Sequence, residues 1–527
     1  MAKRRIVWGL CCLVLALASC TALAAQRSIT FETIQHEKTE AREAYSDIEV
    51  TTPLARIILS EQGGVMKSVF LSFAPYGSNV AELVAGTTTN IKTFERTYLA
   101  NTIFPFAVSV NGETEGLYQL VEKNVDPTTG VFGAVFRGTV AGMTVEKRYT
   151  ISPDAIYTIG FALSVKNPTA TAAQVQMTVG DYVQKAGGLD VTYLLNGQPA
   201  TQLLARESIK TFGGVGLMNK QTVFFLSPTS GVSMDPTFER TASGSQHFGF
   251  SFIAQPQTEE TTAKSTLYAG RRRFLLMQEA GIQALDHPGV GARMMIPVIQ
   301  FVDLLARATG NYGWAIILFT ILTRLLLWPL MNKQMHSMAR LQRLQPKMKR
   351  IQERFKDDKA LLQQRLMELY KKEGINPMSG CLPMVIQLPI IFVIWRAILY
   401  AGERIHLSPG FLWMPDLSLY DPYFILVVLT TAIMIFQQWK LTPQPDSEGA
   451  AGTKYFGYVF PVLMAILLWK FPAGLWLYYL LTTAAQAGQQ AVVNEQLARA
   501  DRLAAATSVG DLDLGDGDED GRSTPGG

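Results

Sequence analysis

The sequence of 527 residues contains little cysteine, little histidine and no motif for nucleotide or metal chemistry. Its four cysteines are Cys11, Cys12, Cys20 and Cys381, so residues 26–290 contain none and cannot be held by a disulfide framework. There is no CxxC pair, no His/Cys cluster with metal-ligand spacing and no GxxxxGK[ST] phosphate loop. We therefore expect no metal, no nucleotide chemistry and no cofactor.

Charged residues are also scarce, at 17% against 48% hydrophobic residues, and the two kinds are separated along the chain. Apolar residues crowd into 6–25 and 310–492, whereas 26–290 has the composition of an ordinary soluble domain. Several apolar runs of about 17–22 residues are typical of a polytopic α-helical membrane protein. The sequence therefore predicts membrane spans together with one large extramembrane domain.

The N-terminus leaves two interpretations open. MAKRR precedes an apolar run that ends at Ala25, which fits an uncleaved signal anchor over residues 1–25 as the first span. The stretch Leu17-Ala18-Ser19-Cys20 also fits a lipobox, which would make residues 1–25 a lipoprotein signal cleaved before a lipidated Cys20. Both interpretations place residue 26 onward on the outer side of the membrane.

Residues 26–290 have the pattern of an all-β domain. The run Tyr157–Val165 alternates apolar and small or polar residues, and Asn167-Pro168 follows it. Similar short runs occur at 50–60, 104–110, 131–137, 174–179, 222–227 and 248–254. Many short strands without intervening helices predict an antiparallel β-sandwich.

Nothing in this domain predicts catalysis. A sugar-processing sandwich would need paired carboxylates or a histidine with a carboxylate. The three histidines of this domain, His36, His247 and His287, belong to no recognisable motif. We expect a structural or docking module and no enzymatic activity.

After the β domain, the sequence predicts an interfacial amphipathic helix at 291–308. Five membrane spans are predicted at 309–331, 381–401, 422–440, 455–471 and 473–492. Outside the spans lie a periplasmic loop at 402–421, a cytoplasmic loop at 441–454 and a tail at 493–527. In the amphipathic helix, Val298, Ile299, Val302 and Leu305 would form the apolar face, and Gln300, Asp303 and Arg307 the opposite, polar face. Lys470, Pro472 and Gly474 break the last two spans into a hairpin.

Residues 332–380 form the basic segment that fixes the orientation. Twelve Lys/Arg stand against five Asp/Glu between residues 332 and 374, so the positive-inside rule makes this segment cytoplasmic. Its periodicity predicts a helical hairpin whose second helix begins at Asp357-Asp358. Two interpretations explain its positive charge. The segment is either a solvated charged face beside an anionic membrane or a platform for acidic partners, such as ribosomal RNA or lipid headgroups. No sequence-specific nucleic-acid binding is expected.

Arg324 lies about a dozen residues into its span, where a charge costs about 2.5–3.5 kcal/mol on insertion scales. Thr320 lies one turn before it, and the last span has a polar stripe of Tyr479, Thr483, Gln486 and Gln490. Gln387, Gln437 and Gln438 add polar groups in other spans. Because no span contains Asp or Glu, these residues predict a hydrated, positively charged groove open to the cytoplasm. A purely structural Arg324, bonded to backbone carbonyls, is the alternative. We expect Arg396, near the outer end of its span, to be structural.

Two other classes of function remain as alternatives. A small-solute transporter would show internal repeats and a midplane ion site, and neither is evident. A passive cell-envelope assembly scaffold would tolerate substitution of Arg324 but not deletion of residues 26–290.

Several segments together resemble the YidC/Oxa/Alb family of membrane protein insertases. They are NYGWAIILFTILTRLLLWPL, the Met338-Ala339 and Leu344-Gln345-Pro346-Lys347 stretches, INPMSGCLPMVIQLPI and FPAGLWLYYL. The resemblance covers about 296–492, and EKRYTISPDAIYTIGFALSVKNPT resembles the large periplasmic β-supersandwich of the Gram-negative branch.

This resemblance implies a multi-pass inner-membrane insertase that has five core spans plus the N-terminal anchor and acts alone or with the Sec translocon. Arg324 would be the functional arginine of the groove, Thr320 and Tyr479 would contact nascent membrane proteins, and Gln438 and Gln486 would line the same groove. The hairpin at 332–374 would contact the ribosome. The tail departs from the family because DLDLGDGDED is acidic, so we expect no ribosome contact from it.

Overall fold

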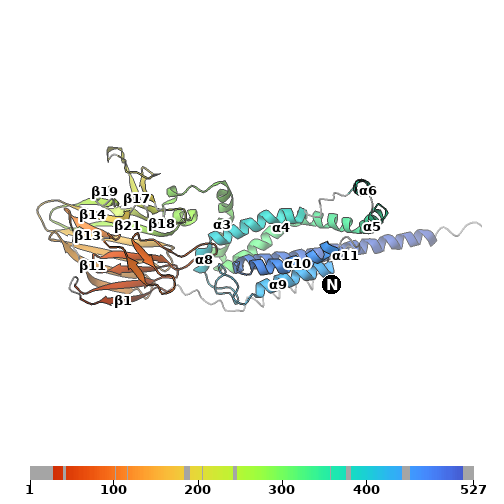
Figure 1. Ribbon diagram of the computed structural model, residues 1–527, viewed down its shortest axis with the longest axis horizontal. Coiled ribbons are helices and arrows are strands. Elements are labelled where there is room, and N and C mark those ends of the chain that lie inside the picture. Colours follow the sequence, from red (N-terminus) through yellow and green to blue (C-terminus); the bar gives the residue numbers. More distant parts are fainter. Residues whose placement is uncertain are drawn as a thin grey trace, which may run out of the picture. The chain divides into compact units, whose positions relative to one another are not determined.

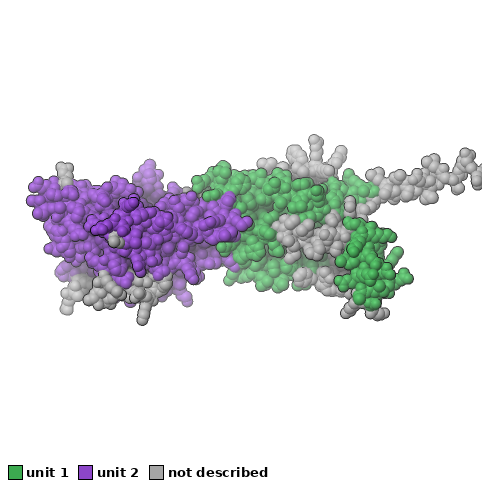
Figure 2. All heavy atoms as spheres, turned by 90° about the horizontal axis from the view of Figure 1, so that it is seen from above, with its two compact units in different colours: residues 1–23, 298–398, 409–527 green, residues 24–297, 399–408 purple. Residues whose placement is uncertain are grey.

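The computed structural model describes residues 28–38, 43–100, 102–114, 117–182, 190–204, 206–240, 246–355, 358–374, 382–441 and 451–513 (Figure 1). The predicted anchor at 1–25, with Cys20, lies outside the described residues. The described chain forms two compact units (Figure 2). The β unit contains the residues up to 297 together with 399–408, and the helical unit contains 298–398 and the residues from 409 onward.

Antiparallel sheets make up the β unit. One five-stranded sheet has the order β1 (Thr30–His36), β2 (Tyr45–Thr51), β3 (Arg56–Ser60), β4 (Val65–Leu71) and β5 (Ala81–Glu82). The nine-stranded sheet has the order β10 (Gln119–Val125), β11 (Phe132–Val140), β12 (Met143–Ile151), β13 (Thr158–Asn167), β21 (Thr258–Arg271), β18 (Thr222–Gly231), β17 (Phe212–Met218), β15 (Asp190–Leu195) and β16 (Gln198–Ala200). The other five-stranded sheet has the order β19 (Asp235–Arg240), β20 (Gln246–Ala254), β14 (Ala173–Tyr182), β8 (Ala107–Val110) and β9 (Glu113–Thr114), and β6 (Thr87–Thr89) pairs with β7 (Arg96–Tyr98).

The sandwich follows from the alternation in the sequence. Along β13, Ile159, Phe161, Leu163 and Val165 are buried while the residues between them are more exposed. The nine-stranded sheet packs against the sheet that contains β14 and β20. The prediction of an antiparallel β domain is therefore confirmed.

Lys147, on β12, is buried in the core of the β unit with no exposed surface. Its Nζ donates hydrogen bonds to Gly63 O at 2.6 Å and Phe106 O at 2.7 Å, and it lies 4.3 Å from the centre of the Tyr118 ring. Burial lowers the pKa of Lys147 well below its ordinary value. The amino group thus donates its hydrogen bonds to backbone carbonyls of the β unit itself.

Residues 399–408 belong to the β unit although they follow a helix of the helical unit. The carboxylate of Glu403, fully buried, lies 3.7 Å from Arg271 Nε, 3.9 Å from Arg273 Nε and 3.5 Å from the Tyr157 hydroxyl. Burial raises the pKa of Glu403, and the two arginines oppose that shift. The predicted loop at 402–421 is therefore divided between the two units. Short helices complete the β unit: α2 (Phe274–Glu279), α8 (Gly402–His406), and the 3₁₀ turns η1 (Arg206–Ser208) and η2 (Gln283–Leu285).

Long helices form the other unit. They are α3 (Val290–Thr309), which begins in the β unit, α4 (Tyr312–Arg343), α5 (Gln345–Arg354), α6 (Lys359–Lys372), α7 (Leu382–Tyr400), α9 (Ile425–Phe436), the π-helix η4 (Gln437–Leu441), α10 (Ala451–Leu468) and α11 (Ala473–Asp513). The break between α10 and α11 falls at the predicted Lys470–Pro472 position. Asp358 is the N-cap of α6, since its carboxylate accepts hydrogen bonds from Ala360 N and Leu361 N at 3.0 Å each.

The predicted polar face of the amphipathic helix is wrong at Asp303. Asp303 is only 5% exposed, and its carboxylate accepts a 2.6 Å hydrogen bond from the Tyr312 hydroxyl. Leu304 is instead 60% exposed. Helical spacing alone cannot identify a partner supplied by the next helix, and this partner makes burial of the carboxylate favourable.

Within the described residues, one helix is long and apolar enough to cross a membrane, namely Tyr312–His336 in α4. Shorter apolar helical stretches lie at Leu388–Tyr400, Ile425–Trp439 and Gly457–Leu468. Each predicted core span coincides with a helix, although only α4 passes this test of length and hydropathy.

Candidate functional site: a polar face between α4 and α11

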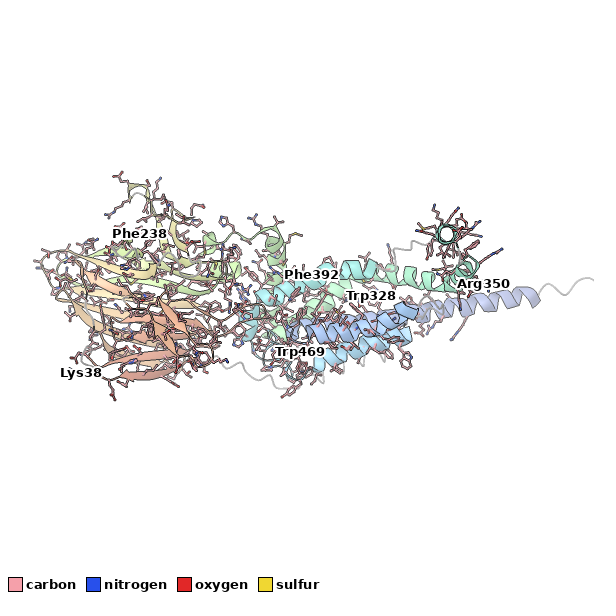
Figure 3. The ribbon with its side chains drawn as sticks, in the orientation of Figure 1. Lys38, Phe238, Trp328, Arg350, Phe392 and Trp469 are labelled. Atoms are coloured by element: carbon pink, nitrogen blue, oxygen red, sulfur yellow. The ribbon has the colours of Figure 1, made fainter. Side chains whose placement is uncertain are left out.

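α4 positions Arg324 within a continuous apolar helix. Asn311 starts that helix, because its side-chain oxygen accepts a 2.7 Å hydrogen bond from Gly313 N. Its amide nitrogen also donates to Pro409 O and Gly410 O at 3.0 Å each, which joins the start of α4 to the segment before α9. Leu326 and Trp328 are exposed on α4, and Trp328 is labelled in Figure 3.

Arg324 is partly buried, and its Nη1 atom is fully buried. The guanidinium interacts electrostatically with the phenol of Tyr478 on α11, a helix that packs against α4. Thr320, one turn earlier, is 2% exposed and donates a 2.7 Å hydrogen bond to Ile316 O. The arginine therefore lies on the face of α4 that meets α11, not on its exposed side.

α11 presents Tyr478, Thr482 and Gln489 as a buried polar stripe. Among the described residues, the Thr482 hydroxyl and the Gln489 amide nitrogen have no hydrogen-bond partner. The same is true of both amide atoms of Gln334, which is buried on α4. Buried polar groups are normally paired with protein or water, and an unpaired group costs about 1–3 kcal/mol. The α4–α11 face thus has hydrogen-bonding capacity that the fold leaves unused.

The predicted stripe lies beside this one. Thr483 is buried and donates to Tyr479 O at 2.7 Å, and the Tyr479 ring lies 6.2 Å from that of Trp476. Gln486 is partly buried. Gln490, the last member, accepts a 2.8 Å hydrogen bond from the Gln437 side chain in η4. This end of the predicted stripe therefore meets the segment after α9.

Gln438 contacts α10. Its amide packs so closely on Gly457 of α10 that a Cβ at Gly457 would clash with it. The adjacent Gln437 is hydrogen-bonded to α11 through Gln490. The side chain of Gln387 lies outside the part of the structure that is described.

Sequence reasoning missed four polar residues of this face: Gln334, Tyr478, Thr482 and Gln489. Tyr478 and Tyr479 are adjacent, and a polar residue follows each at helical spacing, so the sequence gives two candidate stripes. Gln334 falls within the basic segment at 332–380, and the sequence predicts surface positions throughout that segment. Its position three turns after Arg324 on one helix was the available signal.

The basic hairpin packs α5 against α6. Lys347 forms a 2.7 Å ion pair with Glu373, and the Tyr370 hydroxyl lies 3.7 Å from Met348 Sδ. Arg350, labelled in Figure 3, and Arg354 are both exposed on α5, and neither forms an ion pair with a described residue of α6. The hairpin therefore keeps part of its positive charge available to a partner.

Comparison with known proteins gives a consistent result. Residues 304–500 match the family described as 60Kd inner membrane protein. A membrane protein insertase YidC of Syntrophus aciditrophicus is 30% identical over 484 residues, which cover 87% of this chain and 86% of that protein. The chain belongs to the YidC insertase family.

Other members of the YidC family support the same assignment. The YidC insertase of Wolinella succinogenes is 42% identical over 245 residues, 46% of this chain and 45% of its own. The fold matches a structure described as "Active YidC insertase crystal structure with the first transmembrane domain resolved", with a TM-score of 0.51, 21% identity and coverage of 93% of this chain and 99% of that one. The chain is accordingly an inner-membrane protein that has the YidC fold with a large β-rich domain.

Proposed function

We propose that the chain inserts nascent membrane proteins into the inner membrane, and that the α4–α11 face receives the polar part of the segment being inserted. The observation that carries this proposal is the set of buried, unused hydrogen-bonding groups at Gln334 on α4, the helix that contains Arg324, and at Thr482 and Gln489 on α11, the helix that contains Tyr478. Water would satisfy these groups at rest, and polar groups of a nascent chain would replace that water.

The apolar and polar parts of an inserting segment contribute free energies of opposite sign. Each Leu, Ile, Phe or Val that enters lipid contributes about −0.3 to −0.6 kcal/mol, so a 20-residue apolar segment drives its own insertion. The barrier comes from the polar flank. The guanidinium of Arg324 attracts acidic and dipolar groups of that flank, and Thr320, Tyr479, Thr483, Gln486 and Gln438 are the further proposed contacts.

The proposed topology has the β unit in the periplasm, and the hairpin at 332–380 and the tail in the cytoplasm. α4, α7, α9, α10 and α11 would be the five core spans, with residues 1–25 as a sixth. The basic hairpin would contact the ribosome and anionic lipids without reading nucleic-acid sequence, and the Sec translocon would be a partner for some substrates. No catalytic step is involved.

Replacing Arg324 by Ala tests this function. In cells depleted of the endogenous insertase, Arg324→Ala should fail to support growth and insertion of single-span substrates, whereas Arg324→Lys should retain part of the activity. Arg396→Ala is the matched control, since Arg396 is exposed on α7 and should tolerate the change. Full insertion by Arg324→Ala would contradict the proposal and favour a passive scaffold.

A further inference from the structure

α9 and α10 form an apolar groove away from the α4–α11 face. The groove has a volume of about 640 Å³ and is lined by apolar side chains that include Val428, Ile435, Val462 and Ile466. Val428 is 63% exposed and Ile466 65% exposed. A surface this apolar lies against lipid when the helices span a membrane.

One end of the groove is marked by aromatic rings and a cation. Phe424, just before α9, and Trp469, just after α10, have ring centres 5.2 Å apart, and the Tyr420 ring lies 6.4 Å from that of Trp469. Figure 3 shows Trp469 at this end of the α9–α10 pair. Lys470 is exposed, with its Nζ 4.9 Å from the centre of the Trp469 ring. Tryptophan, tyrosine and lysine in this arrangement are typical of the level of lipid headgroups.

We propose that this groove is a phospholipid site, in which an acyl chain fills the groove and the headgroup phosphate binds Lys470. The charge of Lys470 complements a phosphate at the depth where the aromatic rings end the apolar surface. The proposal depends on α9 and α10 spanning the membrane and does not depend on the insertase activity.

The size of the groove suits an acyl chain better than a transmembrane helix. A helix is about 10–12 Å across and would place only one face in the groove, whereas a single acyl chain can lie within it. The volume lies within the roughly 300–1,000 Å³ range of small-molecule sites. An acyl chain is narrow enough to lie between Val428 of α9 and Val462 of α10.

Fluorescence quenching by brominated lipid tests the site. The full chain is reconstituted in phosphatidylcholine bilayers that contain increasing fractions of phosphatidylglycerol with brominated acyl chains. The signal is the quenching that is lost in Trp469→Phe, because Trp469 lines the groove. Both lipids carry a phosphate, but the choline cation neutralises phosphatidylcholine. One lysine attracted to the net negative charge of phosphatidylglycerol therefore predicts half-maximal quenching at an about fivefold lower fraction of phosphatidylglycerol than of brominated phosphatidylcholine.

Two sets of variants distinguish a specific lipid site from non-specific contact with the surrounding lipid. Lys470→Gln should abolish the preference for phosphatidylglycerol, and Lys470→Arg should keep it; Lys333→Gln, at an exposed lysine of α4, is the control. Ala465→Phe should fill the groove and reduce quenching by both lipids, whereas Leu467→Phe, on α10 but outside the groove, should not.

Three results would overturn the proposal. They are an unchanged preference in Lys470→Gln, equal quenching in Ala465→Phe and Leu467→Phe, and capture of a nascent chain in place of lipid by a photo-crosslinker at Val428. The first two would leave Arg324-dependent insertion untouched, so failure of this site is distinguishable from failure of the proposed function.

Discussion

Lys147 in the β unit and the polar side chains between α4 and α11 are both buried, yet they differ in hydrogen bonding. Lys147 donates to two backbone carbonyls at 2.6 and 2.7 Å. Gln334, Thr482 and Gln489 keep polar atoms for which the described residues provide no partner. Burial of Lys147 therefore serves the fold, whereas we propose that burial of Gln334, Thr482 and Gln489 preserves binding capacity, and the predictions below test this difference between the two sets of side chains.

The largest expected effect on stability is at Lys147. Lys147→Met leaves the carbonyls of Gly63 and Phe106 buried without a donor, which should lower the free energy of unfolding of the β unit by about 2–4 kcal/mol. Hydrogen exchange of peptides from β12 measures this loss. Lys166→Met, at an exposed lysine of β13, should change it by less than about 0.5 kcal/mol. If Lys147→Met and Lys166→Met lowered the free energy of unfolding equally, the hydrogen bonds of Lys147 would not stabilise the β unit.

Replacing a buried polar side chain between α4 and α11 by an apolar one should instead raise the free energy of unfolding. Thr482→Val removes a buried hydroxyl whose partner at rest would be an ordered water. Freeing that water should raise the free energy of unfolding of the helical unit by about 1 kcal/mol, while insertion slows. Thermal unfolding followed by tryptophan fluorescence and an insertion assay measure the two effects. Thr430→Val is the control for insertion, since the Thr430 hydroxyl already donates to Leu426 O. A loss of stability in Thr482→Val would argue against a wet face.

A smaller effect is expected from pH. Because burial lowers the pKa of Lys147, the unfolded chain binds a proton that the folded β unit has released, at every pH between the folded value and 10.5. The free energy of unfolding should therefore rise with pH across that window. Urea unfolding followed by the β-sheet circular dichroism signal measures the slope, and Lys147→Met should flatten it. An equal slope in both proteins would mean that other groups cause it.

Much of the fold is predictable because local pattern decides it. Alternation over Tyr157–Val165 predicts a strand, Asp358 predicts a helix start, and Pro472 predicts the break before α11. The burial of Asp303 is not predictable in this way, because it depends on a hydroxyl nine residues later on another helix. The polar face of α11 is also not predictable, because it depends on the rotation of α11 about its axis. The sequence alone cannot decide whether Tyr478 or Tyr479 faces Arg324.

Water access to the α4–α11 face is the most direct test of the account. In a chain whose four cysteines are replaced by serine, cysteine is placed at Gln334, at Thr482 or at Leu326, and a membrane-impermeant thiol reagent is added from the cytoplasmic side. Thr482 is 1% exposed and Leu326 is 78% exposed, so a soluble protein would react only at the second. The account predicts labelling of Gln334→Cys and Thr482→Cys but not of lipid-facing Leu326→Cys. Labelling of Leu326→Cys alone would contradict it.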